Sequence, residues 1–474
     1  MYTDIRIDGE SLDLGAVVKV PMDLISPHLS YDTIPGSLAN VPSIPFSVKN
    51  QRIFEYCEMP QAGNDLYSYD CEMFYNGALI YRGKAFVTDS DPLSGYVLKA
   101  GDDYGRFFGV YSNIPLTEID LGTLPIPAIL TAIIKDKGID AVCFPTIVNP
   151  DFYGTNGVAV NYSGFVNECE DGVYTASGPK VPQLFVGYLL KQIAQLTGVT
   201  VSGDFFTHPT WSKLLITNWR ALDLDQTITI NRHVPAWTIG TLLIELRKIP
   251  NLRLRFDRIN KTLTIDFWEP FIDQVPTKDW TLKAKPGHRK FPEFNRRLQL
   301  AFDLDGGDSL MKDKPAALGD YFTPVTGNLG GDAIGLAKVP MKLSTFLIDE
   351  ETGLPIARQT GVTTEFNQLN VNTAPRLLFW HGLIDGIPAA FPSLDGISLY
   401  LVGPSGIAAR SWARTEQMRR EMFYLQKKFT LNETDLALLD FSEPIHYNGL
   451  NYLIAHIQGE LPITSDFACL LVKV

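Results

Sequence analysis

The stretch LALLDFSEPIHYNGLNYLIAHIQGEL, residues 436–461, carries the pattern from which the fold is predicted. Apolar residues alternate with polar ones around Asn448-Gly449, and a shorter echo, FYNGALIYRGKAFV, occupies residues 74–87 around Asn76-Gly77. Asn-Gly pairs tolerate positive φ and therefore favour the two-residue turns of β-hairpins. The sequence predicts two similar hairpins near opposite ends of the chain.

The composition is that of a globular chain with more than one domain. Its 474 residues exceed the size of a simple core, and 45% of them are apolar against 20% charged. No apolar run reaches the roughly 18 residues that a membrane-spanning helix needs. The acidic start, MYTDIRIDGESLDLG, lacks the basic and apolar blocks of a signal peptide. We therefore expect folding in a cytoplasm, without a membrane span.

The cysteines and the net charge exclude further classes. The five cysteines are widely spaced and none forms a CxxC pair, which predicts free thiols: Cys57, Cys71, Cys143, Cys169 and Cys469. The net charge of −12 argues against a protein that binds nucleic acid tightly, because contacts with phosphate need Lys and Arg. The same negative charge is compatible with a channel surface that repels the nucleic-acid backbone and so lets it pass without binding.

Residues 1–115 form the first predicted domain, a β-sheet that could close into a barrel. The segment IRIDGESLDL alternates around Asp8-Gly9, and CEMFYNGALIYRGKAFV alternates around Asn76-Gly77. Residues 116–182 are rich in Pro, Gly and Asn, so we expect an irregular connecting region there.

Residues 183–285 are predicted to form an α+β insertion domain. A helix is expected over 183–197, because apolar residues recur at helical spacing and Gly198 suits a C-terminal cap. A strand-like segment, KLLITNW, follows at 213–219. The segments LRLRFD, residues 252–257, and TLTIDF, residues 262–267, alternate cleanly and predict a hairpin.

A second helix of this domain is predicted from one apolar face: Ile239, Leu242, Leu243, Leu246 and Ile249. The charged residues between them, Glu245, Arg247 and Lys248, are expected to face water.

Residues 286–474 are predicted to form a second β-barrel with a C-terminal helix and the final hairpin. The helix is expected over 411–427, with Met418, Met422 and Leu425 on one face. Thr430 and Glu433 are spaced as a capping box ahead of TDLALLD. The predicted fold class is therefore β-rich α+β, with two related β-barrel domains and an α+β insertion between them.

The sequence contains no residue pattern that identifies a catalytic, cofactor-binding or metal-binding site. Asp70 with Glu72 and Glu168 with Glu170 could serve a glycosidase, but a solvated strand face and an acidic loop are the simpler interpretations. The motif DLDGGDSL, residues 303–310, resembles a calcium loop but lacks its glycine and glutamate positions, so we expect an acidic turn.

The histidines and the nucleotide motifs give the same result. The seven histidines never reach a close metal spacing: His28, His208, His233, His288, His381, His446 and His456. GxSxG, the P-loop and GxGxxG are missing from the sequence. Without an enzyme signature, the chain is interpreted as a non-enzymatic component that binds other proteins and needs no cofactor.

The order of segments resembles a known family. The residues that carry this resemblance are PGSLANVPSIPFSVKNQRIFEY (35–56), the hairpin ending YRGKAFV (81–87), LFVGYLLKQIAQLTGVTVSGDFF (184–206) and LNETDLALLDFSEPIHYNGLNYLIAHI (431–457). Together they resemble tail proteins of phages and prophages of Bacteroides-like bacteria. In layout these are similar to the baseplate or tail hub family, late control protein D-like, of tailed phages and contractile injection systems.

The resemblance implies a homotrimeric ring with two similar β-barrels per chain, and no catalytic residues. The ring would join the tail tube or distal tail protein and the tape measure protein to the spike or fibre proteins. DNA would pass through its channel without specific binding. The implied location is the tail tip or baseplate of the virion, after assembly in the host cytoplasm. The chain departs from some relatives of this family in having no long C-terminal fibre or lytic domain.

Two alternatives stay open. A distal-tail or adaptor ring protein would share the β-barrels but would be hexameric. A carbohydrate-binding or carbohydrate-degrading tail protein would use some of the seven Trp and nineteen Tyr residues to stack on sugars. Exposed aromatic residues flanking a carboxylate pair roughly 5 to 9.5 Å apart would favour this last class.

Overall fold

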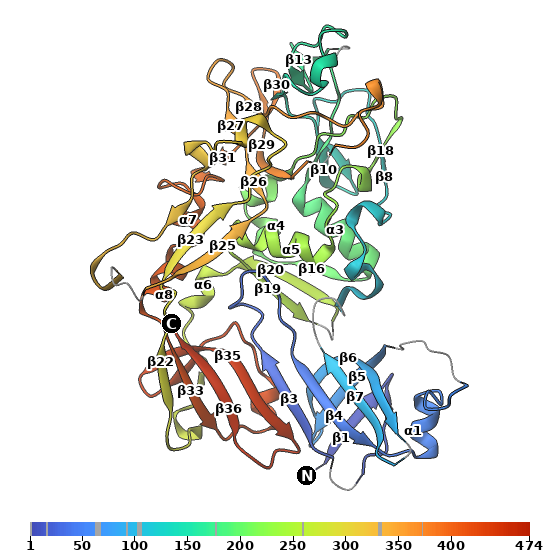
Figure 1. Ribbon diagram of the computed structural model, residues 1–474, viewed down its shortest axis with the longest axis vertical. Coiled ribbons are helices and arrows are strands. Elements are labelled where there is room, and N and C mark those ends of the chain that lie inside the picture. Colours follow the sequence, from blue (N-terminus) through green and yellow to red (C-terminus); the bar gives the residue numbers. More distant parts are fainter. Residues whose placement is uncertain are drawn as a thin grey trace.

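A computed structural model describes residues 2–15, 18–61, 68–91, 93–101, 107–175, 178–257, 260–329, 334–371 and 373–474. The molecule consists of two parts stacked along its long axis (Figure 1). A β-sheet built from both ends of the chain forms the lower part, which we call the terminal sheet. A mixed body of short helices and small sheets forms the upper part. The predicted β-rich α+β class is confirmed.

The terminal sheet contains thirteen strands within the described residues. The first chain end contributes β1 (Thr3–Ile7), β2 (Glu10–Ser11), β3 (Val20–Ile25), β4 (Leu38–Ile44), β5 (Tyr69–Tyr75), β6 (Ala78–Asp91) and β7 (Gly95–Gly101). The second half of the chain contributes β21 (Lys278–Asp279), β22 (Arg289–Pro292), β33 (Phe423–Phe429), β34 (Ile445–Tyr447), β35 (Leu450–Leu461) and β36 (Phe467–Lys473). Its main path runs β2-β1-β5-β6-β7-β4-β3-β35-β36-β33-β22, so the outer strands are β2 and β22.

The predicted hairpins are present, and their turns have the expected backbone. Asn76 and Gly77 have φ of 48° and 84°, and Asn448 and Gly449 have φ of 49° and 81°. Asp8-Gly9 between β1 and β2 follows the same pattern, with 50° and 86°. Two consecutive residues at positive φ define the type I′ turn, whose twist matches that of the paired strands.

The N-terminal and C-terminal β units, predicted as two related β-barrel domains, share one sheet. β3 and β35 pair antiparallel from Val20 opposite Leu461 to Ile25 opposite His456. One apolar core lies beneath both units and includes residues of each, such as Met22 and Ile457. Alternation fixes which face of a strand is buried, but it does not determine which strand pairs with its edge.

The upper body is organised around three helices and two central sheets. α3 (Val186–Thr197) ends at Gly198 in the left-handed region, with φ of 68°, as the sequence predicts. α5 (Ile239–Lys248) begins at Thr238, whose hydroxyl accepts a hydrogen bond from the amide of Thr241. α4 (Asp204–Thr207) is a single turn. β19 (Leu252–Asp257) and β20 (Thr262–Phe267) form the predicted hairpin, and β16 (Thr200–Ser202) pairs parallel with β20.

The second central sheet has seven strands in the described residues: β9 (Ile134–Asp136), β10 (Ile139–Cys143), β15 (Gln183–Phe185), β17 (Leu214–Ile216), β26 (Ser344–Thr345), β29 (Arg376–Ile384) and β30 (Ile387–Phe391). Smaller strands surround it: β8 (Thr123–Pro125), β11 (Ile147–Val148), β12 (Phe165–Val166), β13 (Cys169–Glu170), β14 (Val173–Tyr174), β18 (Thr227–Thr229), β27 (Leu347–Ile348), β28 (Pro355–Ile356), β31 (Ser393–Leu394) and β32 (Ile397–Ser398). A further sheet contains β23 (Arg297–Phe302), β24 (Tyr321–Phe322) and β25 (Leu336–Met341). The remaining α-helices of the described residues are α1 (Val48–Ile53), α6 (Glu269–Ile272), α7 (Ile407–Ser411), α8 (Ala413–Glu421) and α9 (Glu433–Ala437).

The segment 297–412, predicted as part of the second β unit, packs in the upper body. Its β29 pairs with β17 of the middle region, and one core includes Leu215, Leu298, Leu378 and Trp412. From residue 286 onward, only β22 and the strands from β33 on belong to the terminal sheet. The chain thus leaves the sheet after β7, returns to it with β21 and β22, enters the upper body again over 297–412, and returns with β33.

Two local predictions near the C-terminus are wrong. The helix expected over 411–427 ends with α8 at Glu421, and β33 follows, because Leu425, Lys427 and Phe429 are buried at the alternating period of a strand. The capping box of α9 is formed by Asn432 and Asp435, whose side chains each accept a hydrogen bond from the other's amide at 3.0 Å.

No helix among the described residues is both long and apolar enough to cross a membrane.

Candidate functional site

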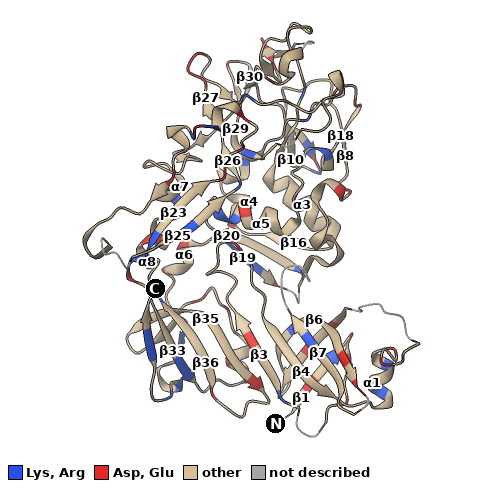
Figure 2. Ribbon diagram, viewed as in Figure 1, with Lys and Arg blue, Asp and Glu red and all other residues tan. Residues whose placement is uncertain are grey.

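The carboxylate pair Asp70 and Glu72 lies on β5, opposite cations of β6. Asp70 is 2.8 Å from the ammonium of Lys84, and Glu72 is 3.2 Å from the guanidinium of Arg82. Figure 2 shows acidic and basic segments side by side in this part of the sheet. Both carboxylates are therefore engaged in cross-strand ion pairs on a solvent-facing surface, in agreement with the simpler sequence interpretation.

The acidic segment around Glu168 and Glu170 is also structural. Glu168 accepts a hydrogen bond of 2.7 Å from the hydroxyl of Thr175, and Glu170 lies exposed on β13. The sequence predicted an acidic loop here, and the structure has a short hairpin of β13 and β14.

The segment DLDGGDSL holds three distant parts of the chain together. Asp308 is fully buried and pairs at 2.6 Å with Arg376, which is fully buried as well. Asp308 also accepts the amides of Leu310 and Arg358, and Asp305 accepts the side-chain amide of Gln359. The sequence predicted an acidic turn, and it gave no signal of the distant arginine.

The histidines and cysteines do not converge on a metal site. Within the described residues, no three His, Cys, Asp or Glu side chains are grouped so that they could hold a metal ion. All five cysteines are free thiols. His456 on β35 contacts the carboxylate of Asp23 on β3 and so bridges the two β units.

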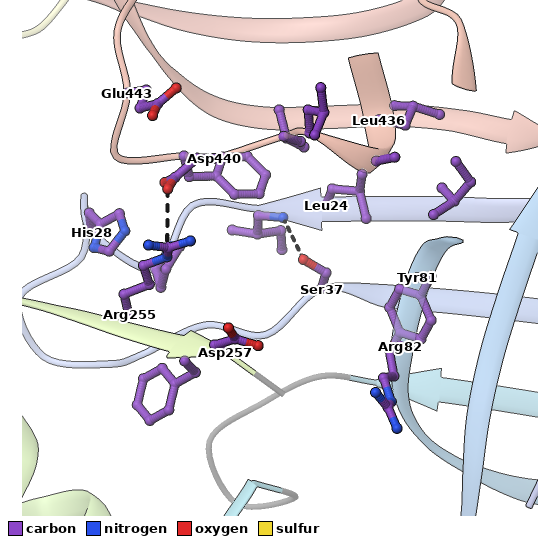
Figure 3. A pocket seen from close by; sticks show the side chains of 18 of the residues that line it. Leu24, His28, Ser37, Tyr81, Arg82, Arg255, Asp257, Leu436, Asp440 and Glu443 are labelled. Carbon is purple, nitrogen blue, oxygen red and sulfur yellow. Dashed lines mark hydrogen bonds and ion pairs between the residues drawn. The ribbon is translucent and has the colours of Figure 1, made fainter. Parts of the chain in front are cut away.

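A cleft between the terminal sheet and the upper body is the main candidate site (Figure 3). We call it the junction cleft, and its volume is about 540 Å³. Residues from both parts line it, among them Leu24, Arg82, Arg255, Phe256, Leu436 and Asp440. β19 contributes one wall, while β6 and the segment after α9 contribute others. The site is therefore assembled from segments that lie far apart in the sequence.

The segment between β3 and β4, residues 26–37, crosses this junction, and we call it the strap. It rises from the terminal sheet and enters the upper body (Figure 1). Ile34 belongs to the apolar core of that body, and the ring of Tyr31 lies 5.2 Å from that of Trp412. His28 stacks on Trp268 at the same centroid distance of 5.2 Å. The strap thus links the terminal sheet to the upper body.

Arg247 on α5 holds the strap from above. Its guanidinium donates hydrogen bonds to the backbone carbonyls of Pro27 at 2.9 Å, Ser30, and Thr33 at 3.3 Å. Burial lowers the pKa of Arg247 to about 10, and the neighbouring Tyr31 and Asp32 oppose this effect.

Lys248 and Glu245 extend this contact and correct a prediction. The ammonium of Lys248 lies 3.0 Å from Asp32 of the strap and 2.9 Å from Glu245, and it donates to the carbonyl of Pro340. Glu245 accepts the amide of Lys342 at 2.8 Å. The charged face of α5 was expected to face water, yet Glu245, Arg247 and Lys248 are only 4 to 6% exposed. They are buried because the strap and β25 pack over that face.

The charges in the junction cleft shift one another's protonation. Burial against Trp268, followed by the nearby Arg253 and Arg247, lowers the pKa of His28 to about 3, so its ring is neutral at pH 7. Burial alone would raise the pKa of Asp440, but hydrogen bonds from Ser442 and the charges of Arg253 and Arg255 outweigh it and lower that pKa. The ionised Asp440 attracts Arg253 and Arg255, while the neutral ring of His28 adds no positive charge beside them.

A second cavity, of about 560 Å³, tests the carbohydrate interpretation. It is lined by His208, Trp211, Phe267, Glu269, Asp395 and Arg410, among others. The ring of Trp211 is only 3% exposed and packs edge-on against Phe379, so its face is not available to a sugar. Glu269 accepts the amides of Arg414 and Thr415 and thereby fixes the start of α8. The arrangement does not meet the sequence criterion of exposed aromatic residues beside a carboxylate pair.

No protein-family model matches the sequence, and no curated protein matches it. Among solved structures, the chain is similar to the 43 kDa tail protein of prophage MuSo2 from Shewanella oneidensis. The two are 10% identical, with 100% of this chain and 97% of that one covered, at a TM-score of 0.40.

Two further structures give comparable values. A tail protein from Neisseria meningitidis is 10% identical, with 99% of this chain and 95% of that one covered, at a TM-score of 0.39. The prophage tail protein gp18 from Listeria monocytogenes is 6% identical, with 99% and 94% covered, at a TM-score of 0.40.

Proposed function

We propose that this chain is a structural protein of a phage tail, and specifically the tail or baseplate hub. In this role three copies form a ring that joins the end of the tail tube to the spike or fibre apparatus. The ring also lines the channel through which DNA leaves. The protein acts by assembly rather than by catalysis, and it works in the virion after assembly in the host cytoplasm.

The observation that carries this proposal is the continuous sheet formed by the two chain ends. Because β3 pairs with β35, each copy presents two β units side by side as one wall. Three such copies would present six β units, which suits a partner ring of sixfold symmetry. The outer strands β2 and β22 lie at the two ends of the main strand path, where neighbouring copies could meet.

The charge distribution supports a channel that DNA passes without specific binding. The chain carries a net charge of −12, which repels phosphate overall. On the terminal sheet, the cations Arg82 and Lys84 each face a carboxylate of a neighbouring strand. Cations that are already paired gain little from contact with phosphate.

The proposed partners follow from the two-part architecture. The terminal sheet would meet the tail tube or distal tail protein, and the tape measure protein would end inside the ring. The upper body would face the spike or fibre proteins. The strap and its contacts with α5 hold the two parts in a fixed relation, as a connector between different partners requires.

The test is the mass of the purified chain in solution by light scattering, alone and with a co-expressed neighbouring tail protein. A hub gives three times the chain mass of 52.8 kDa. A hexamer would favour the distal-tail or adaptor ring. A stable monomer in both samples would contradict a ring component of either kind.

A further inference from the structure

Two hairpins far apart in the sequence lie together at the end of the molecule opposite the terminal sheet (Figure 1). One consists of β13 and β14, and the other is the end of the β29–β30 hairpin. The thiol of Cys169 in the first lies 3.9 Å from the carbonyl oxygen of Gly386 in the second. We call residues 169–174 and 383–387 together the distal tip.

The turns of both hairpins in the distal tip have the same backbone conformation. Asp171 and Gly172 have φ of 47° and 78°, and Asp385 and Gly386 have φ of 51° and 81°. These are type I′ turns, which fix the direction of the adjoining strands.

The distal tip exposes aliphatic side chains. Val173 is 69% exposed, Leu383 56% and Ile384 42%. By contrast, β29 is buried from Arg376 to Trp380, so exposure begins only where the hairpin leaves the body. Three exposed aliphatic side chains on two adjoining hairpins offer apolar area that a partner protein could cover.

The base of the distal tip is held by a network of buried hydrogen bonds. Asn167 is fully buried, and its side-chain amide donates to the carbonyls of Pro145 at 3.0 Å and Val181 at 2.8 Å. The same side chain accepts the amide of Val181 at 2.7 Å, and the hydroxyl of Thr146 donates to the Asn167 carbonyl. This network holds the first hairpin in place, and a surface presented on a rigid support loses little entropy when a partner binds.

The charges on the distal tip define the chemistry of that partner. Glu170, Asp171 and Asp385 are exposed, and none of them forms an ion pair with a residue in the described part of the chain. An apolar surface edged by three carboxylates complements an apolar socket edged by Lys or Arg. The same charges repel phosphate, and they repel a second distal tip as well.

We propose that the distal tip docks a partner protein through an apolar socket with a basic rim. This inference rests on the proposed function, because the partner sought is another protein of the same tail. It adds to that function the surface used, the residues that carry the contact and the chemistry of the partner.

The experiment measures binding of the purified full-length chain to each purified tail protein encoded beside it, at low and at moderate salt. The first variant, Val173→Ser with Leu383→Ser, removes apolar contact. The second, Glu170→Gln with Asp171→Asn and Asp385→Asn, removes charge, and asparagine tolerates the positive φ of both turns. The matched control is Leu282→Ser, at a leucine that is 99% exposed outside the distal tip. Thermal unfolding confirms that each variant is folded.

For one partner, we expect the serine variant to bind about tenfold more weakly than the wild type, as truncation at a central contact does. The amide variant should bind more weakly at low salt and lose most of the salt dependence, while the control binds normally. If a partner binds all variants equally, the distal tip is not the docking surface and the proposed function stands. If the wild type binds none of the tail proteins, both proposals fail.

Discussion

Replacing Arg247 by alanine should release the strap from the upper body. The guanidinium of Arg247 is the donor to three strap carbonyls, those of Pro27, Ser30 and Thr33. The side chain is nearly buried, so water cannot readily replace these bonds once it is removed. The effect should therefore concentrate in residues 26–37.

The magnitude follows from two opposing terms. Hydrogen bonds from a charged donor contribute about 1.5 to 3 kcal/mol each, so three give roughly 4.5 to 9 kcal/mol. Burial lowers the pKa of Arg247 from 12.5 to about 10. At roughly 1.4 kcal/mol per pKa unit, this is a cost on the order of 3 kcal/mol for burying the charge. The net stabilisation lost in Arg247→Ala is therefore about 3 kcal/mol.

The assay is amide hydrogen exchange of the strap, with urea unfolding as a second measurement. A loss of about 3 kcal/mol corresponds to exchange on the order of a hundredfold faster where the strap opens locally. The control is Arg232→Ala, which removes a half-exposed arginine paired with Asp225 at 3.1 Å and should change stability by less than about 0.5 kcal/mol. If strap amides exchange no faster in Arg247→Ala than in this control, Arg247 does not hold the strap and the reasoning is refuted.

Three further predictions test other parts of the structure. Gly459→Ala would place a methyl group against the ring of Phe467 beside the β3–β35 pairing, so we expect a loss of about 2 kcal/mol in urea unfolding. Gly306→Ala, with open space around it, should cost little, and equal effects would contradict the packing argument. Asp308→Asn leaves Arg376 buried without its anion and should cost about 3 kcal/mol, whereas Asp70→Asn at the exposed Lys84 pair should cost less than about 0.5 kcal/mol. Burial lowers the pKa of His233 to about 3 in the folded chain. Below pH 6.5 the His233 ring is therefore protonated in the unfolded chain but stays neutral in the folded chain. Wild-type stability should therefore fall by about 1.4 kcal/mol per pH unit for this group between pH 6 and pH 4, and His233→Gln should fall less steeply. Parallel pH profiles of the two proteins would show that His233 is not the group responsible.

Features governed by local chemistry were predictable from the sequence. The Asn76-Gly77 and Asn448-Gly449 turns adopt the expected backbone because only residues that tolerate positive φ can form a two-residue hairpin turn. The cap at Gly198 and the strands over 252–257 and 262–267 depend in the same way on neighbours in the sequence. The prediction that Asp70 and Glu72 lie on a solvated strand face was correct for the same reason.

Predictions that required knowledge of distant neighbours were wrong or missing. The periodicity of α5 identified its apolar face, but it gave no sign that the strap and β25 cover Glu245, Arg247 and Lys248 on the other. The buried pair of Asp308 with Arg376 joins residues 68 positions apart, and neither residue lies in a motif that indicates the other.

The sequence by itself determined the turns, the alternating strands and the β-rich α+β class, because each depends on side chains within a few residues of one another. Only the tertiary structure decided that β3 pairs with β35, and hence that the two chain ends form one sheet. The backbone groups along a strand edge are chemically alike in every strand, so the choice of partner is made by packing of the whole chain. The junction cleft has the same origin, since its walls come from the strap, β6, β19 and the segment after α9.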